Sequence, residues 1–155
     1  MKSSQILIFT DLDGSLLDHN NFEFREIQNF ILKCIKNGIK IIPNTSKTKI
    51  EIQVFIDQLG QNLPFIVENG AAIHNLNLIH SKIKINDNSL VFSRSLSEIL
   101  KQFKKNIPMD FQKRCMFLKD MTSTEQMKIL GLNKKYLSFA LNRDYSMPLV
   151  FDGSR

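Results

Sequence analysis

The chain is poor in cysteine, in long apolar runs and in low-complexity sequence. Only two of its 155 residues are cysteines, Cys34 and Cys115, which lie far apart, so we expect reduced, packed thiols in a cytoplasmic protein rather than a disulfide. The longest apolar runs have the length of short strands, and a strand is predicted from residue 5, so we expect neither a membrane span nor a secretory leader. No internal repeat is present.

The charge is basic but dispersed. Twenty-one lysines and arginines against 15 acidic residues give a net charge of +6. One small group stands out, Lys101, Lys104 and Lys105, without an accompanying aromatic stripe. This balance favours anionic ligands in general and predicts no nucleic-acid partner. With 43% hydrophobic residues, the length indicates one globular domain, or one and a fraction.

Two carboxylates follow the first apolar run. Residues 6–9 predict a buried strand, and Asp11 and Asp13 come directly after it, before a Gly-Ser turn. The two side chains point the same way, about 6–7 Å apart, which is costly unless a cation or a shared proton relieves the repulsion. This pattern suits a carboxylate nucleophile with a neighbouring acid and base, and Mg²⁺, acting on a phosphate. The alternative is a strand that ends in a polar turn.

Strands and helices alternate over the first half of the chain. Three segments predict strands: residues 5–9, 39–42 and 64–67. Two amphipathic segments between them predict helices: residues 22–36 and 48–59. This order favours an α/β fold with parallel pairing and a ligand site at the carboxyl ends of the strands. Four polar residues fall at those ends: Asp11, Asp13, Thr45 and Glu68.

The second half of the chain has a different order of predicted helices and strands. Residues 76–85 predict a hairpin, and capping residues predict three helices that begin after Ser95, Thr122 and Asn133. Residues 114–118 and 149–151 predict extended segments. This mixture indicates an α+β segment that is distinct from the parallel layer.

Residues 44–48, with the sequence Asn-Thr-Ser-Lys-Thr, join the second strand to a helix N-terminus. Hydroxyl groups, backbone N–H groups and the helix dipole can bind an anion there, and Lys47 adds positive charge. The alternative is an ordinary helix cap. Beside the aspartate pair, we predict a phosphate site formed by Thr45, Ser46 and Lys47.

These motifs resemble those of the haloacid dehalogenase superfamily of phosphatases. More narrowly, residues 10–19, 45–48 and 64–73 are similar to mannosyl-3-phosphoglycerate phosphatases, where Thr-Ser-Lys-Thr replaces the Thr-Gly-Arg of related sugar-phosphate phosphatases. The similarity continues through residues 140–148, although Met147 stands where the family usually has a glutamate. The resemblance implies a Rossmann-like core, with residues 1–80 as its N-terminal half, and an inserted α+β cap, of which residues 81–155 are part.

The resemblance also implies roles for individual residues. Asp11 would be the nucleophile that forms an aspartyl-phosphate, and Asp13 would protonate the leaving oxygen and then deprotonate water. Mg²⁺ would bind the Asp11 carboxylate and the Asp13 backbone carbonyl. Thr45 would hold the transferred phosphoryl group, and Arg143 would bind substrate from the cap. His19 matches the family pattern and receives no role.

Family members continue past the cap with a lysine and a Gly-Asp-x-x-x-Asp segment that complete the site, and nothing after Phe151 resembles these. We therefore expect a truncated family member, a fragment or one half of an assembly, with an unpaired edge on its first strand. For residues 1–155 alone we expect weak or absent hydrolysis, and either marginal stability or self-association through that edge.

The expected function is that of a Mg²⁺-dependent phosphatase of a phosphorylated sugar acid, with mannosyl-3-phosphoglycerate favoured. Two alternatives stay open at this point. One is a general sugar-phosphate phosphatase of the same superfamily, and the other is a truncated, non-catalytic chain that binds phosphorylated ligands.

Overall fold

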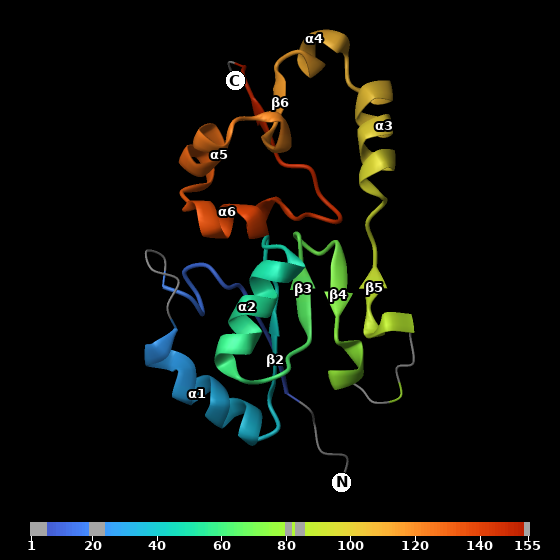
Figure 1. The fold of residues 1–155 in the computed structure, drawn as a ribbon. Helices are drawn as coiled ribbons and strands as arrows, with labels where there is room; N and C mark the ends of the chain where they lie inside the picture. Colours follow the sequence, from blue (N-terminus) through green and yellow to red (C-terminus); the bar gives the residue numbers. More distant parts are fainter. Residues whose placement is uncertain (1–5, 19–23, 80–81, 83–85, 154–155) are drawn as a thin grey trace. The chain divides into compact units, whose positions relative to one another are not determined.

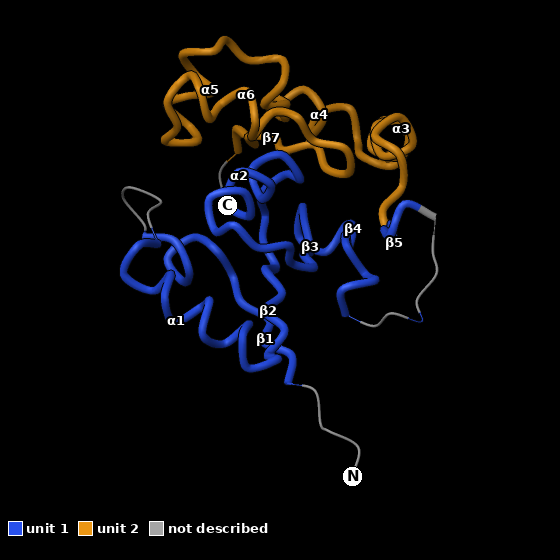
Figure 2. Tube along the Cα trace, turned by 60° about the horizontal axis from the view of Figure 1, so that its bottom comes forward, with its two compact units in different colours: residues 1–92 blue, residues 93–155 orange. Residues whose placement is uncertain are grey.

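The computed structural model describes residues 6–18, 24–79, 82 and 86–153. The chain divides into two compact units, residues 1–92 and 93–155 (Figure 2). Each unit has its own sheet pairing and its own helices. The assignment of residues 1–80 to a core and 81–155 to a cap stays a prediction.

The first unit contains a parallel strand pair and an antiparallel sheet. Strands β1 (Leu7–Thr10) and β2 (Lys40–Pro43) pair in parallel, with Leu7 opposite Lys40. The antiparallel sheet is built from β3 (Phe65–Val67), β4 (Ala72–His74) and β5 (Leu90–Val91). A parallel bridge between Asn44 and Ile66 links β2 to β3, so the three predicted strands run side by side (Figure 1). The α/β fold class is confirmed.

The hairpin lies earlier in the sequence than predicted. Strands β3 and β4 form it, around a turn in which Glu68, Asn69 and Gly70 all have positive φ angles of 49°, 61° and 90°. The prediction of a hairpin over residues 76–85 is wrong, because Asn75 adopts a left-handed conformation and Leu76–Leu78 then form a 3-10 helix. Residues 80–81 and 83–85 of that prediction lie outside the described residues.

Helices α1 (Arg25–Lys36) and α2 (Lys49–Leu59) supply the apolar core beside the strands. As predicted, α1 buries Ile31 and Cys34 on one face, and Phe24 meets Phe55 of α2 edge-to-face at 5.0 Å. Residues 22–23, at the start of the predicted helix, lie outside the described part. The thiols of Cys34 and Cys115 are both free, as expected.

Helix α2 begins and ends where its sequence predicts. The Thr48 hydroxyl accepts a hydrogen bond from the Glu51 N–H, and the Glu51 carboxylate accepts one from the Thr48 N–H, which together form a capping box. Gly60 ends the helix in the left-handed conformation, at φ 69°.

Strand β1 is exposed rather than buried, and our expectation of a buried strand is wrong. The exposed fractions are 55% for Ile6, 40% for Leu7, 39% for Ile8 and 59% for Phe9. In contrast, Ile42 of β2 is completely buried. The physical reason is pairing on one side, since among the described residues β1 pairs with β2 alone. The apolar side chains on both faces of β1 are therefore left exposed to solvent.

The second unit combines helices with one antiparallel strand pair. Strands β6 (Cys115–Phe117) and β7 (Leu149–Phe151) pair with Cys115 opposite Phe151. The unit has four α-helices among its described residues: α3 (Leu96–Asn106), α4 (Met109–Gln112), α5 (Ser123–Leu130) and α6 (Lys134–Leu141). A 3-10 helix, η3 (Leu118–Asp120), follows β6. The predicted caps Ser95, Thr122 and Asn133 all accept backbone hydrogen bonds, whereas the short α4 was not predicted.

Capping also affects the electrostatics of this unit. Hydrogen bonds from the Thr122 side chain and backbone N–H lower the pKa of Glu125 below its usual value. None of the helices in the described residues is long and apolar enough to cross a membrane.

We predict that the Thr48 cap contributes to the stability of α2. Thr48→Val keeps the shape of the side chain but removes the hydroxyl, so the free energy of unfolding should fall by about 1 kcal/mol, as measured by urea denaturation. Thr48→Ser keeps the hydroxyl and serves as the control. A Thr48→Val variant that is as stable as the wild type would contradict the role of the cap.

Candidate functional site

Three strand ends meet at the carboxyl edge of the first unit. The Asn44 N–H donates to the Thr10 carbonyl at 2.8 Å, and the Thr45 N–H donates to the Ile66 carbonyl at 3.1 Å. The turn after β3 closes on the same loop, because Glu68 N–H donates to the Lys47 carbonyl at 3.0 Å. The segments that follow β1, β2 and β3 are therefore held together by backbone hydrogen bonds.

The aspartate loop is anchored by the leucine between the two carboxylates. Leu12 is completely buried and its carbonyl accepts from the Leu17 N–H at 2.8 Å, while Gly14 makes the turn at φ 74°. Because Leu12 points inward, its neighbours face outward: Asp11 is exposed and Asp13 is half-buried. The loop thus exposes Asp11 to solvent, whereas Oδ1 of Asp13 is buried beside Lys47.

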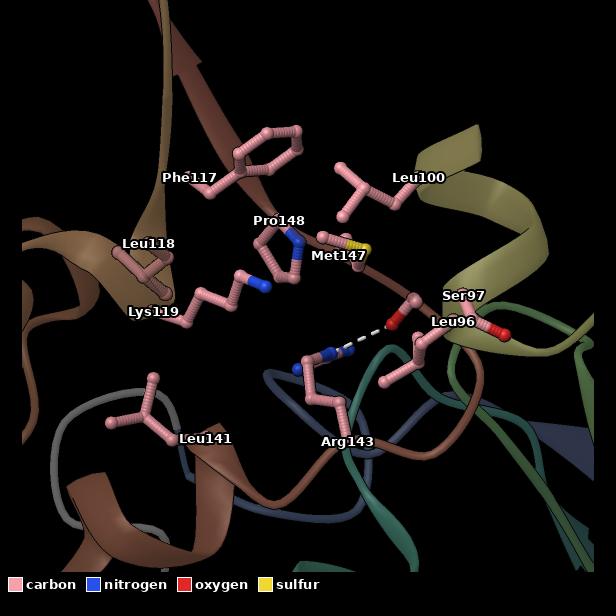
Figure 3. Close-up of a pocket in the computed structure, with 11 residues that line it drawn as sticks. Leu96, Ser97, Leu100, Phe117, Leu118, Lys119, Leu141, Arg143, Met147 and Pro148 are labelled. Carbon is pink, nitrogen blue, oxygen red and sulfur yellow. Dashed lines mark hydrogen bonds between the residues drawn. The ribbon is translucent and has the colours of Figure 1, made fainter. Parts of the chain in front are cut away.

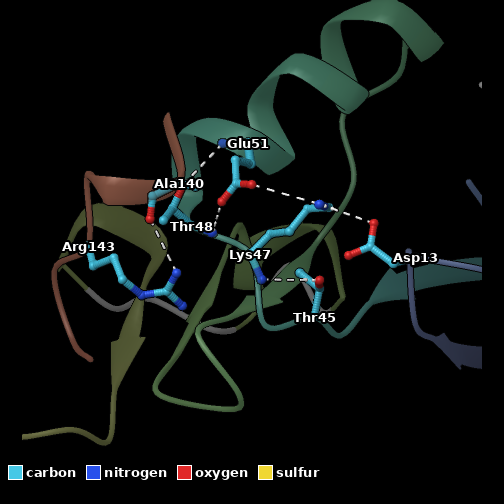
Figure 4. Close-up of polar contacts among 7 residues, drawn as sticks. All are labelled: Asp13, Thr45, Lys47, Thr48, Glu51, Ala140 and Arg143. Carbon is cyan, nitrogen blue, oxygen red and sulfur yellow. Dashed lines mark hydrogen bonds and ion pairs between the residues drawn. The ribbon is translucent and has the colours of Figure 1, made fainter. Parts of the chain in front are cut away.

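Lys47 links the aspartate loop to helix α2 (Figure 4). Its Nζ lies 3.1 Å from Oδ1 of Asp13 and 3.7 Å from Oε1 of Glu51. The second oxygen of Glu51 accepts from the Thr48 N–H at 2.9 Å, so the helix cap also holds the carboxylate beside Lys47. Because the Lys47 side chain is only 14% exposed, this ion pair is screened less than a surface pair.

Thr45 lies between the aspartate loop and the start of α2. The residue is buried, and its hydroxyl oxygen accepts from the Lys47 N–H at 3.2 Å, so the hydroxyl group can donate its hydrogen to another acceptor. Ser46 is exposed on the same loop. The loop therefore combines a hydroxyl, an ammonium group and a helix N-terminus, which are the groups that bind phosphate in proteins.

Arg143 belongs to the second unit, where it has contacts of its own. Its Nε donates to the Ser146 hydroxyl at 2.7 Å. Its Nη1 donates to the Ala140 carbonyl at 3.3 Å (Figure 4). These bonds fix the guanidinium against the end of α6.

The structure brings together most of the residues that the sequence singled out. Asp13, Thr45 and Lys47 are joined by the contacts above, and Asp11 and Ser46 lie on the same two loops. Glu51 was not among the predicted site residues. Its ion pair with Lys47 was not predicted, although the i,i+4 spacing of the two residues is a signal that could have identified it.

The oxygen atoms of Asp11 and Asp13 are compatible with Mg²⁺ but do not complete its coordination sphere. Carboxylate and carbonyl oxygens are the ligands of this ion, and proteins commonly supply only one or two carboxylates beside bound waters. Within the described residues, no three acidic, histidine or cysteine side chains cluster as a metal site. Asp11 is exposed, whereas the Asp13 carboxylate is engaged by Lys47. These residues fit a site in which Asp11 and the Asp13 backbone carbonyl contribute part of the coordination.

Part of the chain is similar in sequence to phosphatases of other organisms. It is 46% identical over 68 residues to the glucosyl-3-phosphoglycerate/mannosyl-3-phosphoglycerate phosphatase of Persephonella marina, an alignment that covers 44% of this chain and 25% of that protein. The protein of the same name from Methanococcoides burtonii is 42% identical over 67 residues, covering 43% of this chain and 25% of its own length. The aligned part thus spans about a quarter of these relatives.

Solved structures show the same fold over a longer stretch. A protein of Geobacillus kaustophilus matches 92% of this chain and 56% of its own, with a TM-score of 0.55 at 16% sequence identity. A haloacid dehalogenase-like hydrolase of Bacteroides thetaiotaomicron matches 66% of this chain and 36% of its own, with a TM-score of 0.50 at 17% identity. At these identities the likeness concerns the fold. The model of the haloacid dehalogenase-like hydrolases matches residues 8–146, and the chain therefore belongs to this family.

Proposed function

We propose that this chain provides the nucleophile and part of the phosphate site of a phosphatase that acts on a phosphorylated sugar acid. The observation that best supports this is the juxtaposition of Asp13 with Lys47 and Thr45, at strand ends where Asp11 is exposed. A carboxylate nucleophile beside an anion-binding helix start is suited to phosphoryl transfer.

Asp11 is the nucleophile in this proposal. One of its carboxylate oxygens attacks phosphorus and forms the acyl-phosphate bond, while the bond between phosphorus and the sugar-side oxygen breaks. Asp13, in its protonated form, gives its proton to that leaving oxygen. Water then attacks the aspartyl-phosphate, Asp13 takes its proton, and inorganic phosphate leaves with Asp11 regenerated as a carboxylate.

Lys47 pairs with the carboxylates of Asp13 and Glu51 in the structure, and a bound phosphoryl group is a further anion within its reach. Its ion pair with Asp13 holds that carboxylate toward the phosphate loop. A bound phosphoryl group competes with Asp13 for the same ammonium, which frees Asp13 for proton transfer. Glu51 keeps Lys47 in place during this exchange, because its position is fixed by the cap of α2.

Mg²⁺ is the proposed cofactor, with Asp11 and the Asp13 backbone carbonyl among its ligands. When bound, the ion offsets negative charge on the phosphoryl group. Thr45 and Lys47 supply the protein's own share of that stabilisation, through the hydroxyl hydrogen and the ammonium group.

The proposed substrate is glucosyl- or mannosyl-3-phosphoglycerate, the compounds named for the relatives that match the first part of the chain. Arg143 is the proposed contact of the second unit with such a substrate. A broader sugar-phosphate phosphatase remains the second candidate, and a panel of phosphorylated sugars with and without a carboxylate distinguishes the two.

The first test concerns Asp11. The assay uses the natural protein that contains residues 1–155. In it, Asp11→Asn should reduce Mg²⁺-dependent phosphate release by several orders of magnitude, because the amide is not nucleophilic. Phosphate release from glucosyl-3-phosphoglycerate measures this, and EDTA should abolish the wild-type rate. Asp57→Asn, an exposed substitution in α2, is the matched control. A near-wild-type rate in Asp11→Asn refutes the covalent mechanism.

The second test concerns the Thr45 hydroxyl. Thr45→Val keeps the buried shape and removes the donor, so kcat/KM should fall by about 10²-fold if the hydroxyl stabilises the transferred phosphoryl group. Thr45→Ser keeps the hydroxyl and should lose much less. Steady-state kinetics of the two variants provide the comparison, and equal losses would indicate a purely structural residue.

We also propose that the open edge of β1 mediates self-association. Both faces of the strand are apolar and exposed, and an unpaired strand edge can add another strand by backbone hydrogen bonds. Phe9 and its neighbours would be buried by such pairing.

A charge on this strand should prevent the association. Phe9→Lys is expected to shift residues 1–155 toward monomer in sedimentation equilibrium, because a lysine at an edge opposes strand addition. Phe30→Lys is the matched control, since Phe30 is 69% exposed but lies on α1. The proposal fails if both variants associate as the wild type does, or if Phe30→Lys is the one that dissociates.

A further inference from the structure

The turn between β3 and β4 has an unusual backbone. Glu68 has a φ angle of 49° and Asn69 one of 61°, so two consecutive residues other than glycine lie in the left-handed region. The reversal of the chain does not require this. Residues 68–71 lie between the paired residues Val67 and Ala72, and hairpin loops of about this length are most often built on a type I turn, which has no positive φ. Strained backbone of this kind is concentrated at functional sites.

The left-handed turn directs two successive N–H groups at the Thr45–Lys47 loop. The Glu68 N–H donates to the Lys47 carbonyl at 3.0 Å, and the Asn69 N–H donates to the Thr45 carbonyl at 3.0 Å. In an extended backbone, the N–H groups of neighbouring residues point to opposite sides of the strand. An extended continuation of β3 would therefore make at most one of these two bonds, whereas the left-handed turn makes both.

These bonds complete the anchoring of Thr45 and Lys47. The Thr45 N–H donates to the Ile66 carbonyl at 3.1 Å, so the segment after β3 holds both backbone groups of Thr45. The Lys47 N–H donates to the Thr45 hydroxyl at 3.2 Å, while the Lys47 carbonyl accepts from Glu68. From this fixed backbone the Lys47 side chain reaches Asp13, at 3.1 Å (Figure 4). The positions of the Thr45 hydroxyl and the Lys47 ammonium thus depend on the turn.

We propose that the left-handed turn positions the phosphate-binding loop, and that Asn69 is the positioning residue within it. Asn69 is exposed, so the core does not need its side chain, and its contribution is that asparagine adopts the left-handed conformation more readily than most residues. Glu68 is only 4% exposed and is less suited to substitution. This role rests on the proposed function, because it takes Thr45 and Lys47 as ligands of a phosphate group.

A residue that resists the left-handed conformation should release the loop. Without the turn, the carbonyls of Thr45 and Lys47 lose the N–H groups that hold them, and the loop adopts other positions. The affinity for phosphate then falls by the fraction of molecules in which the loop is in place. The preference of a β-branched residue against this conformation corresponds to a loss of about tenfold.

The test is a titration of the isotope-labelled natural protein that contains residues 1–155, followed by amide NMR spectra. Inorganic phosphate should shift the amide signals of residues 45–48. Asn69→Val should raise the dissociation constant of phosphate by about tenfold. Asn69→Ala, a milder change that keeps the protein folded, should raise it by about threefold. Asn69→Gly removes the side chain but tolerates the conformation, so its constant should stay within about twofold of the wild type.

Asn88→Val is the matched control. Asn88 is also an exposed asparagine in the left-handed region, at φ 52°, but it lies between β4 and β5. Both valine variants should therefore lose a similar amount of stability in urea denaturation. Only Asn69→Val should weaken the binding of phosphate, whereas a purely structural role would affect the two variants alike.

A kinetic arm tests whether the turn acts through Thr45. In the wild-type background, Asn69→Val should reduce kcat/KM for phosphate release by about tenfold. In the Thr45→Val background the same change should cost much less, because the hydroxyl that the turn positions is already absent.

Four outcomes overturn the proposed role of the turn. They are a wild-type protein in which phosphate shifts none of the signals of residues 45–48, an Asn69→Val variant that binds phosphate as tightly as the wild type, equal losses of affinity in Asn69→Val and Asn88→Val, and an Asn69→Gly variant that loses as much as Asn69→Val. The last would assign a direct contact to the asparagine amide. Failure of the Asp11 test affects only the proposed function, because the phosphate titration involves no turnover.

Discussion

The parallel pairing of β1 with β2 is the constraint on which the rest of the first unit depends. It places the Asp11–Asp13 loop beside the Thr45–Lys47 loop, because parallel neighbours end at the same edge of a sheet. The bridge from Asn44 to Ile66 then adds the turn after β3. Three segments that are distant in sequence are thus held together by backbone hydrogen bonds.

Lys47 adds ion pairs to these backbone hydrogen bonds. A single ammonium lies near the carboxylates of Asp13 and Glu51, which are separated by 38 positions in the sequence. Glu51 is fixed because it also closes the cap of α2. The start of a helix therefore has two roles here: it satisfies its own N–H groups, and it holds the cation that contacts the aspartate loop.

The two units differ in how their charges are arranged. In the first unit the cation is matched by carboxylates, which suits a site where charge moves during a reaction. In the second unit, Lys119 and Arg143 line a pocket whose other walls are largely apolar (Figure 3). Strand β1 is a third kind of surface. Its side chains are apolar and exposed, and the backbone groups along its outer edge have no partner strand among the described residues.

The sequence by itself determined the elements whose signals are local. The caps at Thr48, Ser95 and Thr122 and the left-handed glycine at position 60 are decided within a few residues, so the helices they bound were predicted. The grouping of polar residues at the strand ends was predicted as well. Strands that alternate with helices pair in parallel, and their carboxyl ends then lie at the same edge of the sheet. Only the tertiary structure decided which strands are covered, that Lys47 pairs with Asp13, and that Lys119 and Arg143 line one pocket. The burial of a strand and the pairing of distant charges depend on which segments become neighbours in space. The local sequence around each residue contains no signal for these long-range contacts.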